Sequence, residues 1–271
     1  MGRTLHWERG GAGEPLVLLH GIGSTLEDFA AVRGRLEVEY EVLAADLPGH
    51  GSSPPLRVPP TVSAIADVVE ADLDTLGLDR VHLLGDSLGA RVALELARRH
   101  RARSVVAIAP SGLNSPLERM YQGVVLGTAR VVLRRARTCI EPLSRSRWGR
   151  MALLAVMRAR PLRASQAEAL AVRDGFADSE DFWRMLWHGI LTDVPTGLGD
   201  VDCPVVLAQG LLDVVSAGQT PRFLLIVPGA RFEPLLAAGH APQSDTPDAI
   251  VRMVHEAAGR ATAPPSAEGT P

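Results

Sequence analysis

The sequence predicts an α/β protein whose mostly parallel sheet is covered by helices on both faces. Short apolar runs typical of buried strands alternate with amphipathic segments typical of helices. The alternation stops from about residue 113 to 192, where the pattern is helical, and resumes at Pro204. Before this interruption, a buried strand passes through Gly-x-Ser-x-Gly into a helix, a pattern typical of a sharp strand–turn–helix.

The expected strands begin near the N-terminus. They lie at 4–8, 15–20, 40–46, 81–84, 104–109, 204–209 and 231–236. Amphipathic helices are expected near 26–36, 62–76, 91–99, 220–227 and 247–258. These elements assign 1–112 and 193–260 to a core domain and 113–192 to an inserted helical lid, which we call the helical insert. The polar, proline-rich tail 261–271 is expected to be disordered.

The composition limits which classes of protein are possible. With 271 residues and 46% hydrophobic side chains, the chain is long enough to bury one large core. The net charge of −3 predicts neither a nucleic-acid partner nor a membrane partner. All 28 basic residues are arginine, which excludes a Schiff-base lysine and a phosphate-binding P-loop. The glycines within 21–26 lack the third glycine of a dinucleotide fingerprint, which argues against a nucleotide cofactor.

Cysteine and histidine spacing argues against metals. Cys139 and Cys203 are far apart, and the chain holds no His-x-x-x-His pair and no cysteine cluster. We therefore expect no cofactor and no metal. Reduced thiols, the lack of an apolar leader and the lack of a bilayer-length apolar run favour a cytoplasmic protein. The sequence does not predict the oligomeric state.

The glycine-flanked serine lies in the segment Gly85-Asp86-Ser87-Leu88-Gly89. Its turn is so tight that the central residue is expected in a strained backbone conformation, and the glycines let the helix pack close to the strands. Ser87 should stand clear of the backbone at the positive end of that helix. We predict that Ser87 is a nucleophile, the alternative being an ordinary serine in a strand–helix turn. Asp86 is expected only to shape the turn.

A serine hydroxyl needs a base, usually histidine, that a carboxylate holds in place. For a nucleophile in such a turn, the acid and then the histidine follow the serine along the chain. Asp213 lies just beyond the strand expected at 204–209, and His240 lies in a Gly-His-Ala-Pro loop after the strand expected at 231–236. We predict that both meet Ser87 at the carboxyl edge of the sheet. The alternatives are a helix N-cap for the aspartate and a packing role for the histidine.

A tetrahedral intermediate needs N–H donors for its negative oxygen. The residue after the nucleophile supplies one, which predicts Leu88 as a donor. Gly21 and Gly23 allow the loop after the strand at 15–20 to curl toward the serine, and Ile22 is therefore the second predicted donor.

These motifs together resemble the α/β-hydrolase fold superfamily, in its lidded single-chain branch of esterases, C–C bond hydrolases and cofactor-free haloperoxidase-like proteins. The matching segments are His20–Gly23, Asp46–Ser52, Gly85–Gly89, Gly210–Asp213 and Gly239–Pro242. The resemblance implies an eight-stranded sheet, a lid at about 113–192, the triad Ser87–Asp213–His240 and an oxyanion hole from Ile22 and Leu88. A serine nucleophile departs from the pattern of the related epoxide hydrolases and haloalkane dehalogenases, and argues against both. In this family the region of His50 is usually structural.

The helical insert carries much of the aromatic content and an excess of arginine. Two tryptophans of the insert, Trp183 and Trp187, are expected to bind substrate. Three residues of the core are expected to bind it with them: Ile22, Gly23 and Leu88. Between 113 and 193 there are 13 arginines and 8 acidic residues. This excess fits either a site for an anionic substrate or acidic carrier protein, or a solvated helix face, and we favour the solvated face.

The predicted function is a serine hydrolase that cleaves an ester, thioester or lactone of a small-to-medium, largely apolar substrate through an acyl-enzyme. Two alternatives remain open. The same residues would serve a C–C bond hydrolase acting on a meta-cleavage-type diketone. The fold could also serve as a cyclase, a transferase or a binding scaffold in natural-product biosynthesis. The predicted partner is a small-molecule substrate.

Overall fold

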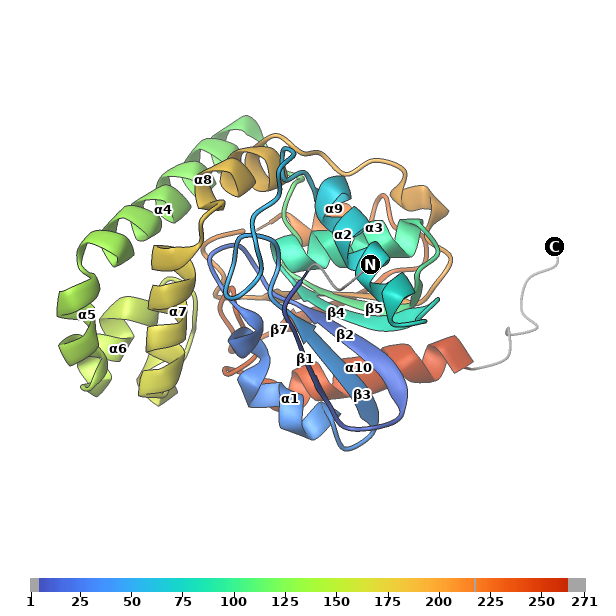
Figure 1. The fold of residues 1–271 in the computed structure, drawn as a ribbon, viewed down its shortest axis with the longest axis horizontal. Coiled ribbons are helices and arrows are strands. Elements are labelled where there is room, and N and C mark those ends of the chain that lie inside the picture. Colours follow the sequence, from blue (N-terminus) through green and yellow to red (C-terminus); the bar gives the residue numbers. More distant parts are fainter. Residues whose placement is uncertain (1–4, 217, 263–271) are drawn as a thin grey trace.

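A seven-stranded sheet lies at the centre of the computed structural model, which describes residues 5–216 and 218–262 (Figure 1). The strands are β1 (Trp7–Gly10), β2 (Glu14–Leu19), β3 (Tyr40–Ala45), β4 (Val81–Asp86), β5 (Ala102–Ile108), β6 (Val205–Gly210) and β7 (Arg231–Leu235). Their order is β1-β3-β2-β4-β5-β6-β7; β1 pairs antiparallel with β3, and the other pairs are parallel. The predicted fold class is therefore confirmed.

The number of strands differs from the eight that the resemblance implies. An eighth strand would have to pair with the outer edge of β1. Only Leu5 and His6 precede β1 in the described part of the chain, and their N–H groups donate to the side chains of Asp72 and Ser53, at 2.9 and 2.8 Å. These bonds hold the start of the described chain against other parts of the core, while His6 O continues the pairing with β3 by accepting the N–H of Asp46 at 3.0 Å.

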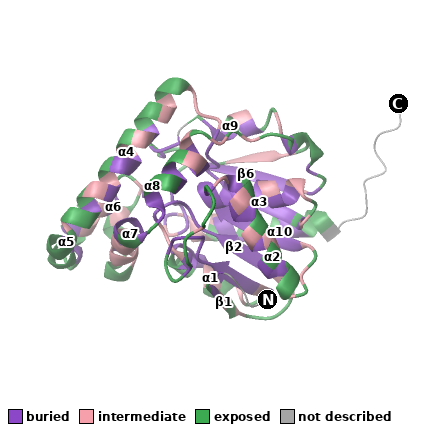
Figure 2. Ribbon diagram, turned by 45° about the horizontal axis from the view of Figure 1, so that its top comes forward, coloured by how far each residue is buried: buried purple, intermediate pink, exposed green. Residues whose placement is uncertain are grey.

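Two layers of helices cover the sheet. The core helices are α1 (Ala30–Leu36), α2 (Val62–Thr75), α3 (Leu88–Arg98), α9 (Thr220–Phe223) and α10 (Pro247–Thr262). Helices α1 and α10 pack on one face, where Leu16 and Leu18 of β2 point, and α2 and α3 pack on the other, where Val17 and Leu19 point. Neighbouring residues of one strand thus belong to different cores. Figure 2 shows the sheet and much of α3 as buried.

The chain between β5 and β6 forms the helical insert, which extends away from the sheet at the left of Figure 1. Its elements are α4 (Pro116–Arg135), α5 (Arg137–Ser144), α6 (Arg147–Leu154), η2 (Pro161–Arg163), α7 (Gln166–Asp178), α8 (Phe182–Met185) and the π-helix η3 (Leu186–Leu191). Capping boxes, in which a serine and the glutamate three residues later bond each other's backbone, start α4 and α7. The helical pattern is thus confirmed, while the division into domains stays a prediction.

Several element ends differ from their predicted positions; α9, for example, ends at Phe223 where the sequence predicted a helix to 227. β4 continues to Asp86, because it pairs with β5 as far as Ile108. Helix α10 continues to Thr262, into the tail predicted as disordered. The rest of that tail, 263–271, lies outside the described residues. Within the described chain, no helix is both long and apolar enough to cross a membrane.

Candidate active site

The turn between β4 and α3 has the strained geometry predicted for a nucleophile. Ser87 has φ 52° and ψ −108°, and only 6% of it is exposed. Glycine is needed on both sides because the turn leaves no room for a Cβ. A Cβ at Gly85 would lie 2.5 Å from Gly89 O, and one at Gly89 would lie 2.7 Å from His20 O and overlap Leu19 O. The first turn of α3 therefore lies directly against β2 and β4, with Ser87 at its N-terminus.

The two predicted oxyanion donors lie next to this turn. Leu88 is the first residue of α3, and Ile22 lies in the loop after β2. Neither N–H donates to an acceptor among the described residues. A Cβ at Gly21 would lie 3.2 Å from Ser87 Cβ, so the loop that carries Ile22 packs against Ser87. The oxyanion hole itself stays a prediction.

Two buried histidines hold that loop. His50 Nε2 accepts the N–H of Gly23 at 3.0 Å, and His20 Nε2 accepts the N–H of Leu47 at 2.9 Å. Each Nδ1 lies within 3.0 Å of a backbone oxygen, which assigns the ring proton to Nδ1. Burial lowers the pKa of His20 to about 4 and that of His50 to about 3, so both rings are neutral near pH 7. Both histidines are therefore scaffolding for the loop.

Asp213 and His240 meet at the carboxyl edge of the sheet. Asp213 Oδ2 lies 3.0 Å from His240 Nδ1. The carboxylate also accepts the N–H groups of Val215 and Ser216, at 2.7 and 3.1 Å, and the hydroxyl of Ser216, at 2.7 Å. These bonds orient Asp213 and favour its ionised form. They also exclude the helix N-cap alternative, because the next helix, α9, begins further along the chain.

Contact between the two side chains shifts both pKa values. Burial acts to raise the pKa of Asp213, but the charge and hydrogen bond of His240 outweigh it and hold that pKa below its usual range. Burial acts to lower the pKa of His240, while the charge and hydrogen bond of Asp213, followed by the charges of Asp86 and Asp28, raise it to about 9. With a pKa of about 9, His240 favours its protonated form near pH 7, as an ion pair with Asp213, and its neutral form can take up a proton.

This ion pair should make stability depend on pH. The raised pKa of His240 contributes stability below the ordinary value of 6.5, and the contribution is lost as pH rises through about 9. The lowered pKa of Asp213 contributes stability above the ordinary value of 3.8, and the contribution is lost at lower pH. Both contributions to stability are therefore complete between pH 3.8 and pH 6.5. We expect His240→Gln to lower the free energy of unfolding by about 3 kcal/mol at about pH 5.5, and by much less at about pH 9.5.

Urea denaturation at both pH values measures this difference. His100→Gln is the matched control, because His100 is exposed and its Nδ1 lies 3.1 Å from Asp202 Oδ2. An exposed pair contributes at most about 1 kcal/mol, so the control should lose little at either pH. An equal loss for His240→Gln at both pH values would contradict the ion pair.

The loop that carries His240 is hydrogen-bonded to the helical insert. The N–H of Ala241 donates to Met157 O at 2.9 Å. The Asp245 carboxylate accepts N–H groups from this loop and from the insert, at 2.8 to 3.0 Å, namely those of Gly239, Ala159 and Arg160. Segment 157–160 of the insert and the loop of the histidine therefore form one bonded unit.

Other parts of the insert lie over the serine turn. A Cβ at Gly23 would lie 2.9 Å from the Phe176 ring of α7, and one at Gly189 of η3 would lie 3.3 Å from Leu88 Cδ1. The side chains on this underside, including Met185, belong to the same buried apolar cluster as Leu88. The insert therefore covers Ser87 with apolar surface, which explains the low exposure of the serine.

Trp183 and Trp187 lie on the opposite face of the same segment. They are 53% and 58% exposed, whereas Met185 and Ile190 are almost completely buried. Helical spacing separates the two pairs onto different faces. Trp183 lines a surface hollow with arginines of α4, namely Arg130, Arg134 and Arg135. The structure does not enclose either tryptophan with Ser87, and their role in substrate binding stays a prediction.

Two arginines of the insert are buried, and both have partners inside the protein. Arg130 donates to two backbone oxygens and lies 5.4 Å from the centre of the Phe182 ring. Arg158 Nη1 lies 3.3 Å from Glu168 Oε1, and its Nη2 lies 3.7 Å from Asp28 Oδ1. Both guanidiniums thus have internal partners, although Arg130 Nε, Arg158 Nε and Arg158 Nη1 are buried without a hydrogen-bond partner among the described residues. Other arginines of the insert are exposed, as a solvated face requires: Arg134, Arg135, Arg137, Arg145 and Arg147.

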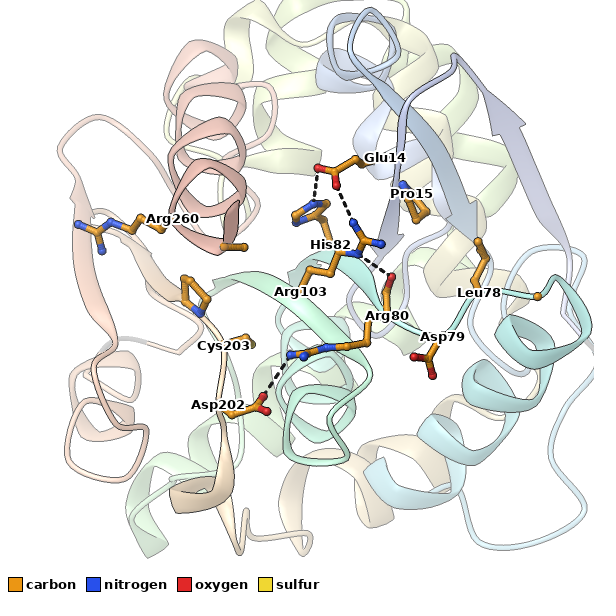
Figure 3. Close-up of a pocket in the computed structure, with 13 residues that line it drawn as sticks. Glu14, Pro15, Leu78, Asp79, Arg80, His82, Arg103, Asp202, Cys203 and Arg260 are labelled. Atoms are coloured by element: carbon orange, nitrogen blue, oxygen red, sulfur yellow. Dashed lines mark hydrogen bonds and ion pairs between the residues drawn. The ribbon is translucent and has the colours of Figure 1, made fainter. Parts of the chain in front are cut away.

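A separate hollow of about 790 Å³ lies at the opposite, amino-terminal edge of the sheet (Figure 3). Glu14 contacts both His82 and Arg103, at 3.2 and 2.6 Å, and Arg80 contacts Asp202 at 3.3 Å. Because most of its charges are paired in this way, the hollow is a weak candidate for a ligand site. Within the described residues, no group of three or more His, Cys, Asp or Glu side chains could hold a metal ion.

Several residues that hold Asp213 and the loop of His240 in place were not predicted from the sequence. Ser216 and Gln209 both donate to Asp213 Oδ2. A serine three residues after an aspartate is a recognisable turn signal, and a glutamine at the end of an apolar strand is unusual enough to be noticed. Asp245 gave no local signal, because two of its three N–H donors are distant in sequence.

Known proteins resemble this chain along most of its length. Residues 16–253 match the model of the alpha/beta hydrolase family. An epoxide hydrolase of Mycobacterium tuberculosis is 31% identical over 206 residues, which cover 71% of this chain and 92% of that protein. The dihydrolipoyllysine-residue acetyltransferase component of the acetoin cleaving system of Pseudomonas putida is 38% identical over 138 residues, or 49% of this chain. The match spans only 37% of that relative's length.

A solved structure shares the whole architecture. The enol-lactonase of Burkholderia xenovorans LB400 has a TM-score of 0.75 at 22% identity, with 93% of this chain and 95% of that chain covered. The fold and the motifs define a hydrolase of the α/β class. The family match over most of the chain adds the family: this chain belongs to the alpha/beta hydrolase family.

Proposed function

We propose that the protein is a serine hydrolase that cleaves an ester, thioester or lactone of a small-to-medium, largely apolar substrate. The observation that carries the proposal is the bond between Asp213 and His240 beside the strained turn of Ser87. A serine in an ordinary strand–helix turn does not require a buried acid–histidine pair at the same edge of the sheet. The N–H groups of Ile22 and Leu88, which have no acceptor among the described residues, support the same reaction.

In the proposed reaction, His240 Nε2 takes the proton of Ser87 Oγ while Oγ attacks the carbonyl carbon of the substrate. The N–H groups of Ile22 and Leu88 stabilise the resulting oxyanion. His240 returns the proton to the leaving alcohol or thiol, which leaves an acyl group on Ser87. Water then gives a proton to His240 and attacks this ester. His240 passes the proton to Ser87 Oγ as the bond to the acyl group breaks, which releases the acid and restores Ser87. Asp213 holds the ring with its proton on Nδ1 and stabilises the imidazolium.

The substrate class follows from the surface over the serine. Phe176 and Met185 of the insert, with Leu88, are apolar, and the buried arginines already have partners inside the protein. This favours an uncharged acyl group over an anionic one. An acidic carrier protein would have to bind the exposed arginines, and no further observation supports such binding. We do not propose the activity of the epoxide hydrolase relative for this chain, because a serine nucleophile departs from the pattern of the epoxide hydrolases.

A fluorophosphonate probe and a substrate panel test the proposal. The probe should modify Ser87, located by peptide mass spectrometry, and should leave Ser87→Ala unmodified. The panel should contain p-nitrophenyl esters of graded acyl length, lactones, thioesters and a coloured meta-cleavage-type diketone. Turnover of the diketone alone would favour the C–C bond hydrolase, since it would use the same residues. Failure of the probe to modify Ser87 would contradict the proposal and favour a non-hydrolytic scaffold.

A further inference from the structure

The helical insert begins and ends at one place in the core. The chain enters it from β5 through Ser111 and Gly112, and leaves it at Asp193. Just inside these ends, the side-chain amide of Asn114 donates to Ile190 O at 3.4 Å, so the two ends lie side by side. The reaction proposed above uses none of these residues. Because the ends are the covalent attachments of the insert, whatever holds them helps to set where the insert lies.

One buried arginine of α3 bonds both ends. Arg91 lies in the first turn of that helix, is 3% exposed, and donates its backbone N–H to Ser87 O at 3.2 Å. Its Nη1 donates to Ser111 O at 2.8 Å and to Asp193 O at 3.4 Å, and its Nη2 donates to Asp193 Oδ1 at 3.4 Å. A single residue therefore joins the turn of Ser87 to the entry and to the exit of the insert.

The neighbouring backbone leaves room for this guanidinium. Gly112 has φ 108°, where a side chain would be strained, and a Cβ there would overlap Arg91 Nη1. The N–H of Gly112 donates to Gln219 Oε1 at 3.0 Å, which fixes the peptide beside the guanidinium. On the other side, Asp193 Oδ2 accepts the N–H of Val62, the first residue of α2, at 2.8 Å. Asp193 is therefore held between α3 and the start of a second core helix.

We propose that Arg91 is a positioning residue that keeps the helical insert in place over Ser87. One guanidinium serves both ends, so a movement of either end breaks at least one of its bonds. These bonds do not depend on the proposed function. The effect on substrates, below, rests on that function, with Ser87 as the nucleophile.

The charge of Arg91 makes such a movement costly. Burial lowers the pKa of Arg91 to about 10, while the charges of Asp193 and Glu95 oppose this, so the guanidinium stays charged near pH 7. Across the contact with the exit of the insert, this cation forms an ion pair with Asp193. Removing one partner of a buried ion pair leaves an uncompensated charge, which is strongly destabilising. Arg91 therefore stabilises the arrangement in which Asp193 stays in contact with α3.

Acyl groups of different length should depend differently on this arrangement. The apolar surface that the insert places over Ser87 includes Phe176 and Met185. A long acyl chain would contact that surface, and each buried methylene adds to binding. An acetyl group extends little beyond the carbonyl carbon and would contact it less. Loss of Arg91 should therefore weaken turnover of long esters and spare the shortest one.

Arg91→Met tests this with p-nitrophenyl esters of graded acyl length. We expect kcat/KM for the acetyl ester within about threefold of wild type, and a fall of about tenfold or more for the octanoyl ester, mainly through a higher KM. Arg91→Lys should lie between wild type and Arg91→Met, because an ammonium lacks the planar fork that bonds two ends at once. An equal loss for every acyl length would overturn the positioning role, since it would mean only that less enzyme is folded.

Arg99→Met is the matched control. Arg99 directly follows the last residue of α3 and forms ion pairs with Asp67, Glu70 and Glu95, all of which lie in the core. This variant also removes an arginine and its ion pairs from the same helix, but it leaves both ends of the insert bonded. It should therefore keep the acyl-length dependence of wild type. A dependence changed as in Arg91→Met would contradict a specific role for Arg91.

Hydrogen exchange of backbone amides gives a readout that does not depend on activity. In a Ser87→Ala background, Arg91→Met should speed exchange in the first turns of α4 and in η3 by about tenfold or more, with α10 unchanged. Failure of the proposed function would leave this result in place. If Arg91→Met does not fold, Asp193→Asn removes the same charge pair while keeping an oxygen for the N–H of Val62, and it should speed the same exchange. Unchanged exchange at both ends of the insert would refute the proposal.

Discussion

Ser87→Ala is expected to lower kcat/KM for the best ester of the panel by about 10⁴-fold or more, with little change in melting temperature. The hydroxyl is the only group lost, and alanine has to adopt the same strained backbone as serine. Stability should therefore change little while the nucleophile is gone. Steady-state kinetics and a thermal melt on the same preparations measure both quantities.

Ser104→Ala is the matched control for this prediction. Ser104 is also a buried serine of the sheet, but it lies near the amino-terminal end of β5, where its Oγ lies 2.8 Å from His82 Nδ1. We expect unchanged kcat/KM and a small loss of stability, because one buried hydrogen bond is lost. Retention of full activity by Ser87→Ala would mean that another group performs the chemistry.

Gly89→Ala is expected to have the largest effect on stability, a loss of about 3 kcal/mol or more. The added Cβ would overlap the backbone oxygen of Leu19 and lie 2.7 Å from that of His20. Backbone atoms at the middle of a sheet cannot move aside as a flexible side chain can. Urea denaturation of the purified variant, or its failure to accumulate as folded protein, measures the effect.

Gly34→Ala provides the comparison, since Gly34 lies within helix α1 and a Cβ there would meet nothing within 4 Å. Alanine is favoured over glycine inside a helix by about 1 kcal/mol, so this variant should be unchanged or more stable. Equal stability of the two variants would contradict the close approach of α3 to β2.

The contact of Asp213 with His240 could be predicted because the residues of the candidate site carry local signals. Ser87 lies between two glycines after an apolar strand, and His240 lies in a glycine–proline loop at the end of another. The parallel sheet then brings their strand ends to one edge, which explains why the predicted contact of Asp213 with His240 could be anticipated. The predicted strand positions were right to within a few residues for the same reason, since each strand is a short apolar run.

What could not be predicted depends on contacts between distant parts of the chain. Gln243 and Asp28 are separated by 215 positions, and no local pattern links them. Asp86 lies next to Ser87 in the sequence, but its sequence neighbours do not reveal that its buried Oδ1 lacks a hydrogen-bond partner among the described residues. The exposure of Trp183 and Trp187 depends on which face of η3 and α8 packs downward, and both faces of that segment carry large apolar residues.

Segment 157–160 and the loop of His240 form one hydrogen-bonded unit. This unit affects how the substrate preference of such a protein can change during evolution. A substitution that shifts this segment also shifts the loop of His240, the proposed base, because Asp245 bonds both of them. Helix α4 and the π-helix η3 have no such bond to that loop among the described residues. We expect a new substrate preference to be selected through changes in α4 and η3, with segment 157–160 held nearly constant, so that the choice of acyl group and the alignment of the base vary independently over evolutionary time.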